Sequence, residues 1–184
     1  MTTFEYFSVL ISVIIGLGIT HLLSGITRLI SHPDRFKLYW IHLLWTGWIF
    51  LYLPYFWWFT FWYNPVEEWS YQLYAFLILN AVVLYMICAV LMPSDAPDNG
   101  DFRRYYFARK RWFFGLLIAS AILDLVDQTI REGSLGPAGE FWAVAYLALV
   151  VPGMVTENEK YHAAMALLAF GTSFVATIIG GRLG

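Results

Sequence analysis

Two aspartates near the end of an apolar segment are the residues best placed to do chemistry. Asp124 and Asp127 follow Ser120 and precede Arg131 at spacings of four, three and four, so the four side chains share one helix face. Asp127 and Arg131 are one turn apart and can form an ion pair. Asp124 has no basic residue one turn earlier and needs a partner from another helix or from water. Asp124 is therefore a candidate proton or cation site, and the alternative is a structural carboxylate at the outer rim.

His21 and Asn80 are the other candidate polar residues inside apolar segments. Counted at about 1.5 Å per residue, His21 lies about 14 Å from the cytoplasmic end of its helix, and Asn80 also lies near the midplane. Ionisable groups at that depth are costly and mark functional sites by default. On this count the depths of His21 and Asp124 differ by about 7 Å, which side chains or a water can bridge. We expect an ion or proton pathway along His21, Asn80, Asp124 and Asp127, unless each residue only ties helices together.

The segment 38–63 is rich in aromatic residues and holds six of the nine tryptophans. Its aromatic clusters at both ends match the belts that anchor helices at the two membrane interfaces. Between these belts, Trp45, Trp48, Tyr52 and Tyr55 recur at three- and four-residue steps and share a face. This face predicts a groove for a flat apolar molecule, a lipid tail or a partner membrane protein. In that alternative the protein is a scaffold or binding subunit.

A basic aromatic run lies at the start of the segment 106–130. Its five cations suit anionic lipid at the cytoplasmic face, and its aromatic rings suit the headgroup level. We therefore predict a lipid headgroup anchor made of Arg103, Arg104, Arg109, Lys110 and Arg111. A voltage sensor needs arginines at every third residue within the hydrocarbon, and none follows Arg111 until Arg131.

The sequence contains no catalytic or metal-binding motif. Neither HxxxH nor HExxH occurs, and the single cysteine, Cys88, excludes a disulfide within the chain or a cysteine metal cage built by it alone. The pair Asp124 and Asp127 has the spacing of acidic motifs in some lipid-modifying enzymes, but their accompanying acidic and basic residues are missing. The four histidines lie at unmatched depths, which disfavours a b-type haem. We expect no metal, cofactor or catalytic residue, and a redox protein is the third functional alternative.

The composition places these residues in a bilayer. Of the 184 residues, 60% are apolar and 13% are charged, whereas a soluble domain has about 25% charged residues. A net charge of −2 provides no basic field, so nucleic acid is excluded as a partner. We predict one all-α domain over 1–184, a polytopic integral membrane protein with about six transmembrane helices. The predicted spans are roughly 6–30, 38–63, 70–92, 106–130, 138–154 and 161–180.

Local signals refine the ends and contacts of these helices. Thr2 with Glu5 and Thr156 with Glu159 resemble capping boxes, and Asp101 suits an N-cap. Gly180 and Gly181 are expected to close the last span, and Pro54 and Pro152 to kink their helices. Small side chains recur every four residues on the first span, which predicts close packing with a helix of the same chain or of another subunit. Together with the aromatic segment, this stripe favours a homo-oligomer; its members are Ser8, Ser12, Gly16, Thr20 and Ser24.

The basic residues predict the orientation. Alternate connections share nine of the eleven lysines and arginines, and such an excess marks the cytoplasmic side. The nine are Arg28, Arg35, Lys37, Arg103, Arg104, Arg109, Lys110, Arg111 and Lys160. Both termini are therefore expected outside the cytoplasm, with a change of side at the C-terminus if 138–154 does not span. The runs 11–30 and 104–128 resemble segments of small bacterial membrane proteins, which implies a bacterial inner membrane and no particular activity.

Overall fold

The computed structural model describes residues 3–63, 66, 69–95 and 100–180. Within this part the chain is all-α and has six α-helices, as the sequence predicts. The α-helices are α1 (Thr3–Ser31), α2 (Trp40–Phe59), α3 (Tyr71–Leu91), α4 (Phe102–Glu132), α5 (Gly136–Val150) and α6 (Glu159–Gly180). Short 3-10 helices are η1 (Pro33–Arg35), η2 (Thr60–Tyr63) and η4 (Val151–Met154).

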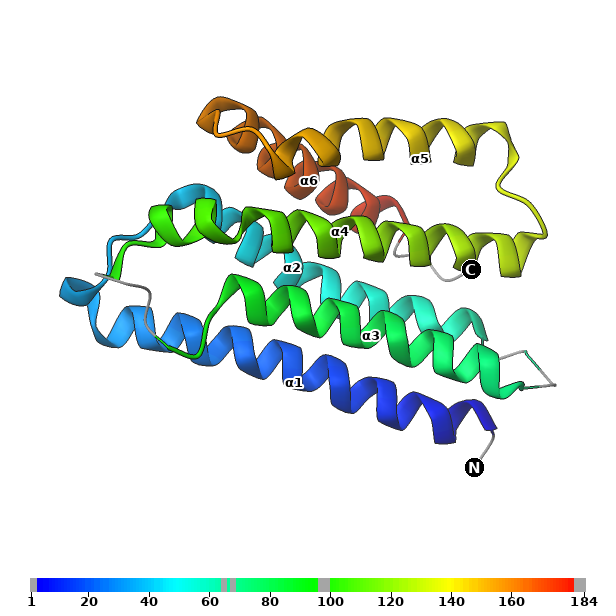
Figure 1. Cartoon of the computed structure of the whole chain (residues 1–184). Helices are drawn as coiled ribbons and strands as arrows, with labels where there is room; N and C mark the ends of the chain where they lie inside the picture. Colours follow the sequence, from blue (N-terminus) through cyan, green and yellow to red (C-terminus); the bar gives the residue numbers. More distant parts are fainter. Residues whose placement is uncertain (1–2, 64–65, 67–68, 96–99, 181–184) are drawn as a thin grey trace.

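Successive helices run in opposite directions (Figure 1). The connection 32–39, residues 92–95 and 100–101, and the connection 151–158 lie at one end, which we call the basic end because most of the cations belong to it. The start of α1, η2 and the turn after α4 lie at the other end, which we call the acidic end because Asp124 and Asp127 are near it. The core between the helices is apolar, and Leu22, Ile49 and Leu84 are fully buried in it.

Three helices are long and apolar enough to cross a membrane. The qualifying stretches are Phe4–Ser31 in α1, Tyr71–Leu91 in α3 and Phe102–Ile130 in α4. A shorter apolar stretch runs over Gly139–Met154, in α5 and η4. Many large apolar side chains on these helices point outward, as on helices surrounded by lipid.

The helix caps follow part of the prediction. Asp101 caps α4, because its carboxylate accepts a hydrogen bond from the Arg104 backbone N–H at 3.0 Å. The capping box predicted at Thr156 and Glu159 is wrong: Asn158 takes that role and accepts from the Lys160 backbone N–H at 3.0 Å. Thr2 and Gly181 lie outside the described residues.

The two internal prolines behave differently. Pro54 lies inside α2, as expected. The kink predicted at Pro152 is wrong, because Pro152 lies in η4, after the end of α5 at Val150. Proline lacks an N–H and suits the first turn of such a short helix, so Pro152 follows the end of α5 and does not interrupt it.

The closest contacts of α1 do not fall on its stripe of small residues. A Cβ at Gly16 would have no neighbour within 4 Å, so this part of the stripe is open. A Cβ at Gly25 would lie 2.9 Å from the Cβ of Met92, and one at Gly18 would lie 3.5 Å from the Cys88 Sγ. The face with Gly18 and Gly25 therefore carries the close packing of α1 against α3.

Backbone hydrogen bonds join two connections at the basic end. The Lys37 N–H donates to the Gly100 carbonyl at 2.9 Å, and the Phe102 N–H donates to the Lys37 carbonyl at 3.1 Å. Gly100 has a φ of +67°, and a Cβ there would lie 2.0 Å from the Arg35 carbonyl oxygen. Only glycine fits this crossing.

Candidate functional site

A cavity of about 480 Å³ lies between α2, α3 and α4, toward the acidic end. It brings together three of the four residues predicted to form an ion pathway, namely Asn80, Asp124 and Asp127. The remaining lining residues are mostly aromatic or polar: Tyr52, Tyr55, Phe56, Phe59, Thr60, Tyr63, Leu77 and Gln128. We call this space the acidic cavity.

Tyrosines of α2 and η2 orient the two carboxylates. The Tyr52 hydroxyl donates to Asp124 Oδ2 at 3.3 Å, and the Tyr63 hydroxyl donates to Asp127 Oδ1. The three-residue spacing on α4 places both carboxylates on the face toward α2. The sequence does not predict these pairings. The one signal for them is the predicted aromatic face, because it includes Tyr52, the donor to Asp124. Arg131, predicted to pair with Asp127, has its side chain outside the described part of the molecule.

Asn80 is a buried polar residue in the wall of the acidic cavity. It comes from α3, its residue is only 2% exposed, and its Oδ1 has no hydrogen-bond partner among the described residues. Leaving a buried polar atom without a partner costs about 1–3 kcal/mol. Asn80 borders the acidic cavity, but its Oδ1 is closed to a molecule the size of water, so a donor in the cavity reaches this oxygen only if the side chain moves.

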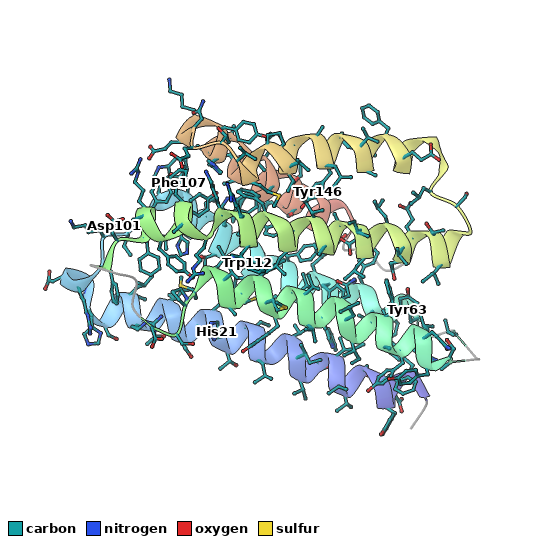
Figure 2. The ribbon with its side chains drawn as sticks, in the orientation of Figure 1. His21, Tyr63, Asp101, Phe107, Trp112 and Tyr146 are labelled. Atoms are coloured by element: carbon teal, nitrogen blue, oxygen red, sulfur yellow. The ribbon has the colours of Figure 1, made fainter. Side chains whose placement is uncertain are left out.

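His21 lies away from this cavity, at the basic end of α3. Its Nε2 is 2.6 Å from the Met92 carbonyl oxygen, and Figure 2 shows it nearer Asp101 than Tyr63. His42 of α2 reaches the Leu91 carbonyl at 2.6 Å, and Arg28 donates to the carbonyls of Pro93 and Ser94. The four consecutive carbonyls at the end of α3 and just after it thus contact side chains from α1 and α2. The structure separates His21 from Asp124 and gives it a capping contact.

The depth count for His21 missed this position because it used α1 alone. α1 runs to Ser31, whereas α3 ends at Leu91, and the next residue, Met92, contacts His21. A residue ten positions before the end of α1 therefore meets the end of its neighbour. The sequence gives the position of a residue along its own helix. Which groups lie beside it depends on where the neighbouring helices end.

The predicted headgroup anchor divides into exposed and buried members. Arg104, Arg109 and Arg111 are exposed, and Arg103 forms an ion pair with Glu159. Lys110 turns inward, is 6% exposed, and donates to the carbonyls of Val155 at 3.1 Å and Thr156 at 2.7 Å. Lys110 thus fastens the connection between η4 and α6.

The aromatic face of α2 lines three successive cavities. Tyr52 and Tyr55 line the acidic cavity. Trp48 and Tyr52 line a middle cavity of about 470 Å³ between α2, α4 and α5. Trp45 and Trp48 line an inner cavity of about 580 Å³ between α2, α5 and α6. All four residues predicted to form a groove therefore border empty space.

The chemistry of the acidic cavity is that of an acceptor site. Its carboxylates, the Asn80 amide oxygen and the Gln128 side chain offer acceptors, and the described lining contains neither lysine nor arginine. Within the described residues, no three His, Cys, Asp or Glu side chains gather as a metal-binding group would require. Such a cavity favours a donor-bearing or positively charged ligand.

Comparisons with known proteins add no relative to this picture. Neither a protein-family model, nor a curated protein, nor a solved structure matches the chain.

Proposed function

We propose that the chain is a multi-pass integral membrane protein that binds a small organic cation in the acidic cavity and moves it across the bilayer. The three long apolar helices support a membrane location. α2 and α6, with 20 and 22 residues, are also long enough to cross a core of about 30 Å. α5 and η4 together supply a shorter antiparallel crossing.

The proposed orientation places the basic end in the cytoplasm of a bacterial cell and both chain termini on the opposite side of the inner membrane. Nine of the eleven lysines and arginines near one end support it through the positive-inside rule. The acidic cavity then faces the outer leaflet. A homo-oligomer stays a prediction, for which the many outward apolar side chains offer surface.

The chemistry of the cavity favours an ammonium group as the cation. A primary ammonium carries three N–H donors, and the cavity presents Asn80, Asp124 and Asp127 as acceptors. Hydrogen bonds between an ammonium and a carboxylate are charge-assisted and stronger than neutral ones. The rings of Tyr52 and Tyr55 add faces that attract a cation. The two carboxylates that border the acidic cavity, with no lysine or arginine in its described lining, carry this proposal.

Binding of ethylammonium to the full chain in lipid nanodiscs tests the proposal. We expect saturable binding that weakens at least about tenfold in Asp124→Asn, since a hydrogen bond to a charged group contributes about 1.5–3 kcal/mol. Asp34→Asn is the matched control, because Asp34 is an exposed aspartate at the basic end. Acetate, which carries the opposite charge, should not bind.

Uptake into proteoliposomes tests the transport step. Ethylammonium entry should exceed that of protein-free vesicles at pH 6, where the amine is charged, and Asp124→Asn should reduce the excess. No saturable binding by the wild type, or equal binding by Asp124→Asn, contradicts the proposed site. Binding without uptake leaves a receptor for the cation and contradicts transport.

A further inference from the structure

We infer that the cation is the head of a single-chain alkylammonium amphiphile whose tail lies in the middle and inner cavities. This inference rests on the proposed function, because it assumes an ammonium in the acidic cavity. The three cavities are consecutive: the first two share Tyr52, Asp124 and Gln128, and the last two share Trp48, Trp142 and Tyr146. The shared walls define one path along α2.

The polarity of the lining falls along this path. The acidic cavity contains both carboxylates and Asn80, whereas the inner cavity is bordered by such side chains as Leu149, Met165 and Leu168. Of the three hydroxyl residues that border the inner cavity, Tyr146, Thr172 and Ser173, the last two hydrogen bond within the protein. Thr172 donates to the Leu168 carbonyl at 2.8 Å, and Ser173 accepts from Trp48 Nε1 at 2.7 Å. The far part of the path therefore suits a hydrocarbon chain.

Aromatic rings of α2 form a continuous wall beside the path. Tyr52 and Tyr55 lie 6.1 Å apart between ring centroids, and Tyr52 stacks on Trp48 at 5.3 Å and 18°. Trp48 meets Trp45 edge-on at 5.6 Å and 88°. A wall of ring faces and edges provides apolar contact over its whole length and a cation-attracting face at the end beside Asp124.

The length of the path matches one lipid leaflet. From Tyr55 to Trp45 is ten helical residues, or about 15 Å. The hydrocarbon core of a bilayer is about 30 Å thick, so the path spans about half of it. Because this stretch is centred on the middle of α2, a bound amphiphile would keep its head on the acidic side of the midplane and extend its tail across the midplane toward the basic end.

The charge of the lining selects among amphiphiles. No lysine or arginine occurs among the described residues that border the three cavities, so a phosphate or sulfate head finds no cation to pair with. Asp124, which borders the first two cavities, would repel such an anion. An ammonium head without a phosphate meets neither difficulty, and phospholipids are therefore disfavoured as occupants.

The experiment compares ethyl-, hexyl- and dodecylammonium on the full chain in nanodiscs of neutral lipid, with partition into empty nanodiscs subtracted. We expect affinity to rise with chain length in the wild type, and dodecanol and dodecyl sulfate to bind at least about tenfold more weakly than dodecylammonium. Ala143→Phe, in the middle cavity, should lower dodecylammonium affinity about tenfold and leave ethylammonium affinity within about twofold. Ala148→Phe, on the exposed side of α5, is the matched control.

Each outcome is decisive. Equal affinity for ethyl- and dodecylammonium in the wild type overturns the tail assignment and leaves the proposed function standing. Failure of every ammonium to bind overturns the proposed function itself. Equally tight binding of dodecyl sulfate overturns the assignment of the head. The wild-type chain-length series needs no variant, so it decides the question even where Ala143→Phe does not fold.

Discussion

The two ends of the bundle both hold polar side chains, but these side chains meet different partners. At the basic end, His21, His42 and Lys110 reach backbone carbonyls that would otherwise end a helix or turn without a donor. At the acidic end, Asn80 and Asp124 border empty space. At the basic end, side chains of α1 and α2 contact the end of a neighbouring element, whereas at the acidic end the two carboxylates border a cavity between helices.

This difference separates structural from functional polar groups in apolar helices. A buried polar group bonded to a backbone carbonyl stabilises the fold, and its removal leaves that carbonyl unsatisfied. A buried polar group that faces a cavity costs stability until a ligand arrives. Substitutions at the basic end should therefore lower stability without changing ligand affinity. Substitutions in the acidic cavity should lower ligand affinity without lowering stability.

The largest expected effect is that of Gly100→Ala at the basic end. A side chain there meets the Arg35 carbonyl at 2.0 Å and a φ of +67°, so the free energy of unfolding should fall by about 3 kcal/mol or more. Gly133→Ala is the control, because Gly133 has a φ of +77° but no neighbour within 4 Å. It should show only the backbone strain of about 1–2 kcal/mol. Denaturant titration in detergent measures both, and equal losses would refute the close contact.

Removal of His21 should have the next largest effect. His21→Ala leaves the Met92 carbonyl without its side-chain partner and should cost about 1–3 kcal/mol of stability. Ethylammonium affinity should stay within about twofold, because His21 does not border the acidic cavity. Thermal unfolding and titration of the same sample provide the two readouts. A large loss of affinity at unchanged stability would place His21 in the binding machinery and remove the contrast between the two ends.

Asn80→Leu should have the opposite effects, because it should weaken ligand binding without lowering stability. It removes a buried acceptor that lacks a partner among the described residues, so stability should be unchanged or higher by up to about 1 kcal/mol. Ethylammonium affinity should fall about tenfold. Gln72→Leu, at an exposed position of α3, is the control for the change of side-chain type. A marked loss of stability in Asn80→Leu would show that the amide serves the fold.

The smallest expected effect concerns Asp101, the N-cap of α4. The hydrogen bond from the Arg104 backbone N–H holds the pKa of this carboxyl below its ordinary value of 3.8. A carboxylate with a lowered pKa stabilises the fold above pH 3.8 and loses this contribution as the pH falls through the folded-state pKa. Asp101→Asn keeps a capping side chain without the titration. The stability difference between wild type and variant should be constant from pH 7 to pH 5 and shrink in acid.

The helices themselves follow from the sequence because apolar length is a strong signal. The predicted segment 70–92 and the observed α3 differ by one residue at each end. α4 begins at Phe102, four residues before the predicted span, because Phe102 and Tyr106 bury their rings while the arginines between them stay outside. Hydropathy alone does not register this amphipathic first turn.

The meeting of helix faces could not be predicted in the same way. The sequence places Asp124 and Asp127 on one face of α4, but it does not say that Tyr52 of α2 and Tyr63 of η2 donate to them. The sequence also predicts Lys110 to be exposed with the arginines, whereas Lys110 is buried and donates to the carbonyls of Val155 and Thr156. Each of these contacts joins residues more than 40 positions apart, and local patterns carry no information about such pairs.

The crossing of the chain at Gly100 has a mechanical consequence. Its two backbone hydrogen bonds join the α1–α2 hairpin to the α3–α4 hairpin at the basic end, where His21 and His42 also contact the end of α3. Two hairpins that are joined at the basic end can separate most at the acidic end. Motion between the hairpins would therefore widen the acidic cavity and leave the basic end closed.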